Sequence, residues 1–165
     1  MRILGIDTSL RSTGLGIIES VGSQHRLVEA LTVSIPATHP LSTCLGILDA
    51  SVSDAIVAHR PEVAAVEGIF FCRNVKTAVA LGEARGVVIA ACHRAGLAVY
   101  EYAPRRIKQA LVGHGEASKN QVARMVMRLL ALPEIPQEDS ADALAIAICH
   151  AHARTAVAGL APGPI

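Results

Sequence analysis

Two short apolar runs in this chain each end in a carboxylate, and this pattern limits how the chain can fold. Asp7 follows the apolar residues 3–6, and Glu67 follows the apolar residues 63–66. Such runs are typical of buried strands, and an acid at the end of a buried strand must be paired, neutralised or bound to a metal ion. If the two strands are parallel neighbours, both carboxylates emerge at the same edge of one sheet.

A second pair of acids opens an apolar helix near the end of the chain. Asp139 and Asp142 precede residues 143–148, and because they are three residues apart they share one helix face. Together with Asp7 and Glu67 they could hold two Mg²⁺ ions about 3.5–4 Å apart, the spacing used for in-line phosphoryl displacement. Mg²⁺ binds few protein ligands and keeps several waters. The four acids therefore predict metal-assisted phosphodiester hydrolysis.

Each acid also has a simpler explanation when it is taken alone. Asp7 could form an Asx turn with the residues after it, and Asp139 and Asp142 could interact favourably with a helix N-terminus. Glu67 is harder to explain in this way, because a glutamate after four apolar strand residues has no routine structural role. The combination of all four favours a catalytic site.

The apolar periodicity and the turn residues predict the element order β-β-β-α-β-α-β-α-α-α, whose first three strands form an antiparallel meander. The expected strands are 2–7, 14–20, 27–35, 63–67 and 97–102, and the expected helices are 41–59, 78–95, 104–112, 118–132 and 137–156. Ser118 and Gln121 fit a capping box at the start of the fourth helix. We expect an α/β fold with a mixed five-stranded sheet flanked by helices, in one domain over residues 1–157, followed by a disordered tail over 158–165.

The second expected helix carries a stripe of small residues. Ala78, Gly82, Gly86 and Ala90 are four residues apart and share one face. Each interior glycine costs about 1 kcal/mol relative to alanine, so the close approach of another element should offset this cost. Packing on the sheet and packing on a second copy of the chain both remain open.

Composition and cysteine use indicate a reduced, cytoplasmic protein. The chain is 52% hydrophobic, yet no apolar run approaches the roughly 18–20 residues that span a bilayer. Cys44, Cys72, Cys92 and Cys149 show no CxxC spacing, so a zinc or disulfide framework is not expected. A strand begins directly after Met1, and we expect no secretory leader.

Positive charge gathers in one segment although the formal net charge is only +1. Between residues 104 and 128 six basic residues stand against the single acid Glu116. Such a cluster can neutralise phosphates, and a solvated helix face explains it equally well. The six basic residues are Arg105, Arg106, Lys108, Lys119, Arg124 and Arg128.

Several motifs resemble those of known nucleases. Residues 5–7 (Gly-Ile-Asp) and 13–16 (Thr-Gly-Leu-Gly) resemble the opening of the ribonuclease-H-like superfamily. Residues 66–67, 81–86 (Leu-Gly-Glu-Ala-Arg-Gly) and 139–147 resemble the RuvC family of Holliday junction resolvases within that superfamily. The chain departs from the family pattern in two places: the family usually has Pro-Gly where this chain has Thr8-Ser9, and often Gln where it has Gly68. These departures concern the loops around the site and the preference at the cut.

The resemblance runs over residues 2–152 and implies a specific activity. A member of this family is a homodimer that nicks two opposed strands of a four-way DNA junction during recombination and repair, using Mg²⁺ or Mn²⁺ and leaving 5′-phosphate ends. It also works with the RuvA and RuvB branch-migration proteins. The catalytic and metal-binding acids carry over onto Asp7, Glu67, Asp139 and Asp142.

The resemblance also suggests which residues contact DNA. Phe70, rather than the phenylalanine after it, stands where the family has a junction-contacting aromatic, and bases unpaired at a junction can stack on such a ring. Lys108 and Lys119 stand where the family places basic residues near the scissile phosphates. Arg73 and Lys76 flank the Phe70 loop and could reach the backbone. Burial of the ring and solvation of the lysines are the structural alternatives.

The histidines carry less information. His150 and His152 lie near the end of the last expected helix, where we expect both to interact with the helix dipole. His114, between two glycines, could reach a phosphate.

Two other readings compete with a junction nuclease. An ATP-dependent sugar kinase or actin-like protein also opens with a Gly-x-Asp strand, but this chain is short for two such lobes and shows no second Gly-rich phosphate loop. A non-catalytic or RNA-processing relative of the same fold is the other alternative. The intact carboxylates and the motif at 81–86 argue against it.

Overall fold

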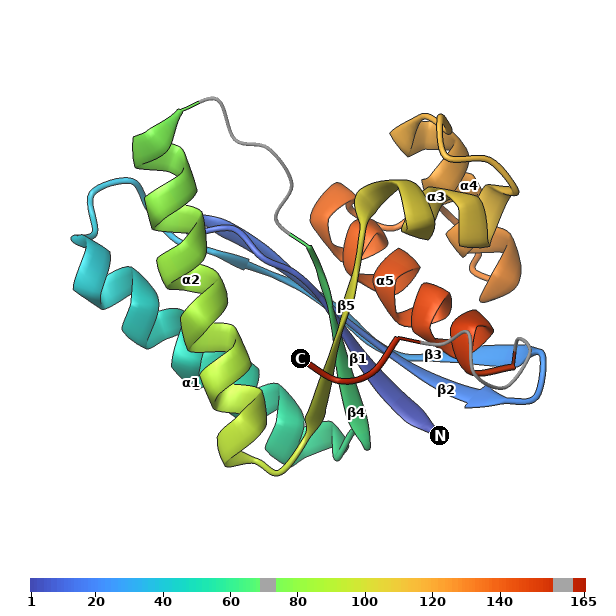
Figure 1. Ribbon diagram of the computed structural model, residues 1–165, viewed down its shortest axis with the longest axis horizontal. Coiled ribbons are helices and arrows are strands. Elements are labelled where there is room, and N and C mark those ends of the chain that lie inside the picture. Colours follow the sequence, from blue (N-terminus) through green and yellow to red (C-terminus); the bar gives the residue numbers. More distant parts are fainter. Residues whose placement is uncertain (69–73, 156–161) are drawn as a thin grey trace.

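The computed structural model describes residues 1–68, 74–155 and 162–165 and follows the expected element order (Figure 1). The strands of this described part are Arg2–Asp7 (β1), Ser12–Val21 (β2), Gln24–Ser34 (β3), Val63–Glu67 (β4) and Ala98–Tyr102 (β5). Its helices are Leu41–His59 (α1), Val75–Arg94 (α2), Pro104–Val112 (α3), Lys119–Leu129 (α4) and Glu138–Thr155 (α5). Three element ends differ from expectation by three residues: β3 and α2 each begin three residues earlier, and α4 ends three residues earlier, before Ala131 with its positive φ of 50°.

The strands form one five-stranded mixed sheet in the order β3-β2-β1-β4-β5. The β1-β2 and β2-β3 pairs are antiparallel, as expected of a meander, and the β1-β4 and β4-β5 pairs are parallel. Ile6 pairs with Val66, so the acids that follow them leave the sheet at the same edge. The expected mixed α/β sheet is confirmed.

Helices cover both faces of the sheet and create two cores. Figure 1 shows α1 and α2 on one side and α3, α4 and α5 on the other. Side chains alternate along β1: Leu4 and Ile6 join the core under α1 and α2, while Ile3 joins the core under α5. Both cores therefore meet at β1, the strand that carries Asp7.

Helix α5 packs unusually close to the sheet because glycines lie beneath it. A Cβ atom on Gly5 would stand 2.1 Å from the backbone oxygen of Ala143, and one on Gly14 would stand 1.9 Å from that of Asp139. Only glycine fits at these two positions without displacement of the helix. The two glycines thus hold the acid-bearing start of α5 against β1 and β2.

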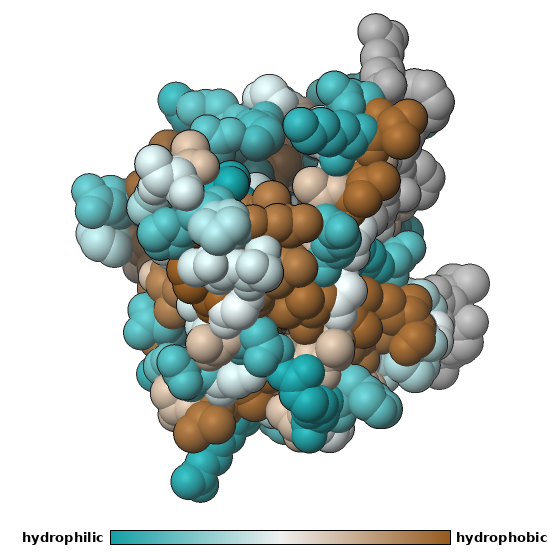
Figure 2. Space-filling view, turned by 90° about the vertical axis from the view of Figure 1, so that its left-hand side faces the viewer, coloured by the Kyte–Doolittle hydropathy of each residue, from teal (hydrophilic) through white to brown (hydrophobic). Residues whose placement is uncertain are grey.

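The small-residue stripe of α2 faces away from the sheet. Gly82, Gly86 and Ala90 are exposed, and a Cβ atom on either glycine would meet nothing within 4 Å. Figure 2 views the molecule from the α1 and α2 side, where apolar and near-neutral residues lie together across the face. Packing on the sheet therefore does not explain the stripe.

Helix α1 differs from one expectation. By length and composition alone it is apolar enough to cross a membrane, although no run of that kind was expected. Cys44, Leu48 and Val52 of this helix are fully buried and belong to the core beneath α1 and α2. These contacts account for part of its apolar character.

The cysteines and the end of the chain are described only in part. Cys44, Cys92 and Cys149 are buried free thiols, and burial raises the pKa of the last two to about 12. Cys72 lies outside the described residues. In the described part of the expected tail, the backbone N–H of Ile165 donates to the Val99 carbonyl at 2.9 Å.

Candidate active site

A cavity of about 300 Å³ opens where β1 and β4 end. Asp7, Glu67 and Asp142 line it together with Lys108 and Lys119. Its remaining wall is mostly apolar: Pro104, Ile107, Val122, Ala145 and Ile146. Acids and lysines thus converge in one partly apolar cavity, which we call the acid cleft.

The acid cleft is formed by the parallel pairing of β1 with β4 and by the packing of α5 on the sheet. Asp7 and Glu67 directly follow the paired residues Ile6 and Val66, so their positions are set by the β1-β4 register. Asp142 comes from the second turn of α5, which packs on β1 and β2. The expectation that acids from two strands and one helix would meet holds for these three residues.

The acids of the cleft repel one another. The pKa of the Asp7 carboxyl is raised to about 7, first by burial and then by the nearby charges of Asp142, Glu67 and Asp139, while the charge of Lys119 lowers it. Burial is also the main cause that raises the pKa of Glu67, followed by the charge of Asp142. A bound cation would relieve this repulsion and the cost of burying charge.

Asp139 has a different environment from the other three acids. Its Oδ2 atom accepts a hydrogen bond from the Ser12 hydroxyl and another from Gln137 Nε2 at 3.3 Å. It does not line the acid cleft, although its charge acts on Asp7. Three of the four expected acids therefore meet in the cleft, and the fourth is held beside it by β2.

Lys119 places a cation next to the acids. Its Nζ atom lies 2.7 Å from Glu138 Oε1 and 3.2 Å from Asp142 Oδ2, and the hydrogen bond to Glu138 is the main cause that raises its pKa. Lys119 is the first residue of α4, and Ser118 and Gln121 cap the N-terminus of this helix with the expected capping box. The lysine thus partly balances the carboxylates of the cleft.

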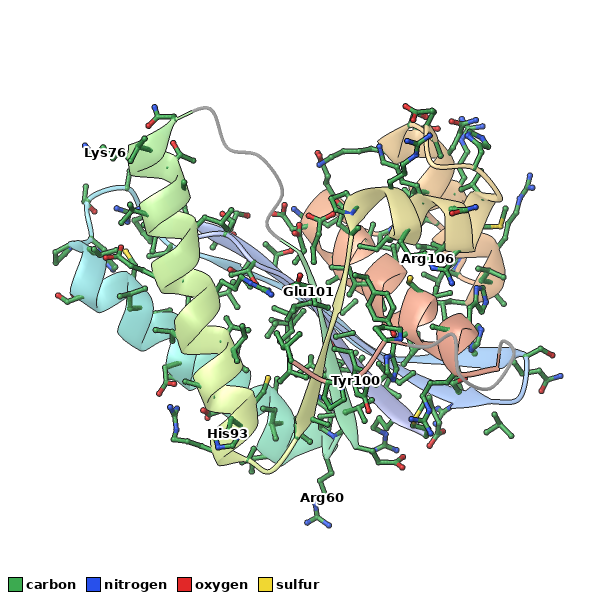
Figure 3. The ribbon with its side chains drawn as sticks, viewed as in Figure 1. Arg60, Lys76, His93, Tyr100, Glu101 and Arg106 are labelled. Atoms are coloured by element: carbon green, nitrogen blue, oxygen red, sulfur yellow. The ribbon has the colours of Figure 1, made fainter. Side chains whose placement is uncertain are left out.

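The other expected DNA-contacting residues are less completely placed. Lys76 is exposed near the start of α2, at the outer end of this helix (Figure 3), and it does not line the acid cleft. Its backbone N–H donates to the Asn74 side chain, which caps this helix. Phe70 and Arg73 lie outside the described residues.

The donor set suits a hard divalent cation. Carboxylate oxygens are the ligands that Mg²⁺ prefers, and Mg²⁺ usually takes only one or two of them and completes its shell with water and phosphate oxygens. Within residues 1–68, 74–155 and 162–165, no group of three or more histidine, cysteine, aspartate or glutamate side chains is arranged to hold a metal ion together. An ion bound beside Asp7, Glu67 and Asp142 would therefore take one or two of these carboxylates and complete its shell with water and substrate oxygens.

Two contacts near the site were not anticipated from the sequence. The Ser12 hydroxyl donates to Asp139, and this bond joins positions 127 residues apart. Arg85 was noted only as part of the motif at 81–86, yet it is buried and its Nη1 donates to the Glu67 carbonyl at 3.1 Å. Neither residue gives a local signal of its partner.

His150 does not behave as expected. Its Nδ1 atom lies 2.9 Å from the Tyr102 hydroxyl, and burial lowers its pKa to about 4. The side chain is therefore neutral near neutral pH, and the expected charge interaction with the helix dipole is wrong for this residue. His152 lies with its Nδ1 3.0 Å from the Ala110 carbonyl.

Comparison with known proteins identifies the family. The model of the family described as "Crossover junction endodeoxyribonuclease RuvC" matches residues 3–150. The chain belongs to the RuvC family. A RuvC of Alkalilimnicola ehrlichii is 51% identical over 92% of this chain and 91% of its own length, and one of Halorhodospira halophila is 50% identical over 94% and 92%. Family membership makes the chain a crossover junction endodeoxyribonuclease, as its motifs suggested.

Solved structures agree with this assignment. The Thermus thermophilus RuvC in complex with a Holliday junction substrate has a TM-score of 0.89 and 37% identity, with 100% of both chains covered. The yeast mitochondrial Holliday junction resolvase has a TM-score of 0.67 at 11% identity and supports the fold alone. The expected ribonuclease-H-like resolvase fold is confirmed.

Proposed function

We propose that this chain resolves four-way DNA junctions by paired, symmetric nicks in opposed strands, in homologous recombination and repair. The observation that carries this proposal is the acid cleft, where Asp7, Glu67 and Asp142 converge beside Lys108 and Lys119. The family assignment and a relative's structure with a Holliday junction substrate support the choice of DNA substrate.

Divalent ions, Mg²⁺ or alternatively Mn²⁺, supply an activated water and stabilise the leaving oxygen when they are bound. Asp7, Glu67 and Asp142 hold up to two ions in this proposal, and Asp139 supports them from its place beside β2. Lys108 and Lys119 position the scissile phosphate and offset charge that develops on it. Cleavage of the P–O3′ bond leaves a 5′-phosphate and a 3′-hydroxyl.

The proposed enzyme acts as a homodimer, because paired nicks require two active sites at a fixed separation. The outer face of α2 is the proposed dimer surface. Val75 and Val79 are 77% and 55% exposed on this helix, and Gly82 and Gly86 leave its surface open to close packing. Exposed apolar residues beside small ones suit a helix–helix contact between copies.

The remaining partners of the proposal come from the family resemblance. In this proposal Phe70 stacks on an unpaired base of the junction, and Arg73 and Lys76 contact the DNA backbone. The RuvA and RuvB proteins deliver the junction in the cytoplasm.

A nicking assay tests the proposed function. Purified protein is incubated with a labelled synthetic four-way junction or the matched linear duplex, with and without Mg²⁺, beside Asp142→Asn. We expect symmetric, Mg²⁺-dependent nicks in the junction alone and none in this variant. Asp54→Asn, which changes an exposed acid of α1, is the matched control and should cleave like the parent. Equal cleavage of the duplex, or undiminished nicking by Asp142→Asn, would contradict the proposal.

A further inference from the structure

A buried arginine connects helix α2 to the strand end that carries Glu67. Arg85 is only 7% exposed, and its guanidinium reaches two acceptors. Nη1 donates to the backbone carbonyl of Glu67 at 3.1 Å, and Nη2 donates to the Glu101 carboxylate. Burying a guanidinium charge costs free energy, and this cost is offset only while its hydrogen-bond partners stay in place. Arg85 has such partners on two neighbouring strands.

The second acceptor lies on the strand next to Glu67. Glu101 of β5 pairs in register with Val66 of β4, one residue before Glu67. Figure 3 shows Glu101 at the centre of the molecule, near the ends of β4 and β5. The guanidinium fork therefore connects the ends of two parallel strands from the side opposite α5.

Gly68 shows how closely this arrangement fits the chain. A Cβ atom at this position would lie 3.0 Å from Glu101 Oε1, which is tighter than ordinary contact. The backbone N–H of Gly68 donates to the Tyr102 carbonyl at 2.9 Å, so the chain continues alongside β5 for one residue beyond β4. Glycine at 68, where the family often has glutamine, leaves room for the Glu101 carboxylate.

We propose that Arg85 is a positioning residue that fixes the Glu67 backbone through its carbonyl and so aims the Glu67 carboxylate into the acid cleft. The side chain of Glu67 faces the cleft, while its carbonyl is held by a group from the other face of the sheet. Without Arg85, the Glu67–Gly68 peptide keeps only the bond from the Gly68 N–H to Tyr102, so the orientation of this peptide and of the Glu67 carboxylate is less restrained. Arg85 itself does not line the cleft.

The inference rests on the proposed function only in naming Glu67 as a metal ligand. Supporting residues behind a metal ligand typically contribute about 10- to 100-fold to metal affinity or activity. We therefore expect Arg85→Gln to weaken Mn²⁺ binding, measured by calorimetric titration of the DNA-free protein, by about tenfold or more. Nicking of the four-way junction should fall by a similar factor at low Mn²⁺, while junction affinity measured without metal stays within about twofold of the parent.

Arg94→Gln is the matched control. Arg94 lies on the same helix and its ion pair with Asp49 is exposed, so its loss removes a comparable contact far from Glu67. This variant should keep the Mn²⁺ affinity and the nicking rate of the parent. A general loosening of α2 would instead affect both variants.

Two further substitutions keep the test decisive if Arg85→Gln does not fold. Arg85→Lys keeps the charge but cannot serve both acceptors as a planar fork, so it should remain impaired in Mn²⁺ binding. Glu101→Ala removes the carboxylate that accepts from Arg85 Nη2 and should also weaken Mn²⁺ binding. Because the two residues act through one contact, the loss in the Arg85→Lys/Glu101→Ala double variant should be smaller than the sum of the two single losses. Full rescue by lysine, or parental Mn²⁺ affinity in all three variants, overturns the proposal.

The two proposals fail in different ways. If the parent protein binds Mn²⁺ but never nicks the four-way junction, the proposed function fails while the Mn²⁺ titrations still decide the role of Arg85. If the parent nicks the junction and Arg85→Gln matches it in both readouts, the proposed function stands and the role of Arg85 is refuted.

Discussion

Asp7 shows most clearly what burial does to a single acid. Its neighbours are three other carboxylates and one ammonium group, and its pKa lies at about 7 because burial and like charges oppose ionisation. Unlike Asp139, whose carboxylate accepts two hydrogen bonds, Asp7 depends mainly on a cation for compensation. This contrast gives the two acids separate roles in the proposed site.

Asp7→Asn should therefore abolish nicking but not folding. The amide keeps the shape of the side chain and removes a repelling charge, so the thermal midpoint of the metal-free protein should not fall. We expect nicking to drop by more than about 100-fold, the scale of losing a group that stabilises charge in a transition state. Junction affinity without metal should change by no more than a few-fold. A variant that retains substantial nicking would remove Asp7 from the catalytic set.

His150 gives the stability of the protein a dependence on pH. Its pKa is about 4 in the folded protein and 6.5 in an exposed histidine, because burial disfavours the charged ring. Between these values the unfolded chain binds the additional proton. The free energy of unfolding therefore falls as the pH decreases from about 6.5 toward 4.

The variant His150→Gln should remove this contribution. The 2.5-unit difference corresponds to about 3 kcal/mol in total, and about 2 kcal/mol of it is lost between pH 7.5 and pH 5, measured as the difference between parent and variant in urea unfolding at these two pH values. His93→Gln, at an exposed position of α2, is the control and should keep the parental dependence. Parallel pH profiles for the parent and His150→Gln would show that His150 is not the cause.

At the scale of elements, the position of α5 depends on the glycines beneath it. Gly5 and Gly14 let the helix backbone approach β1 and β2 at distances that no side chain permits. The same approach brings Asp142 to the acid cleft and Asp139 to Ser12. The contact of α5 with Gly5 and Gly14 therefore sets both how the helix packs on the sheet and where its two acids lie.

Gly14→Ala tests this dependence. The added methyl group would overlap the Asp139 carbonyl, so α5 must shift, and we expect the free energy of unfolding to fall by about 1–3 kcal/mol. Nicking should decrease by more than stability explains, because two acids move with the helix. In Gly46→Ala, at an exposed position of α1 where the methyl meets nothing within 4 Å, stability should rise by up to about 1 kcal/mol. If Gly14→Ala nicked the junction at the parental rate, the site would tolerate a shift of α5 relative to β2.

At the scale of the whole molecule, the acid cleft and the exposed apolar surface lie on opposite sides of the sheet. The α3, α4 and α5 side builds the acid cleft, whereas the α1 and α2 side presents the exposed stripe and the exposed valines (Figure 1). Two copies joined through α2 would leave both clefts accessible to one junction. The separation of these surfaces is compatible with the proposed dimer.

Gly82→Arg should disrupt this association. A long charged side chain on the stripe prevents close helix contact, so sedimentation velocity should change from a dimer to a monomer. Nicking should then become single and unpaired, while each cleft keeps its acids. Ser23→Arg adds the same charge at an exposed turn between β2 and β3 and should remain dimeric. A dimeric Gly82→Arg would place the interface elsewhere.

Local patterns in the sequence were enough to predict the element order, the capping box at Ser118 and the acids at the ends of β1 and β4. These features depend on periodicity and on neighbours within a few residues. Element ends were less accurate where backbone conformation decides them, as at Ala131 beyond α4. The activity came from the motif resemblance, which the comparisons confirmed.

Only the tertiary structure decided which partners these residues meet. The Asp139 bond to Ser12, the Glu67 carbonyl bond to Arg85 and the Tyr102 contact with His150 span 127, 18 and 48 residues of sequence. The tertiary structure also decided that the small-residue stripe of α2 faces outward, because this depends on which face of the helix packs against the sheet. Burial and distance between remote segments set these contacts and the pKa values that follow from them, and no local pattern carries that information.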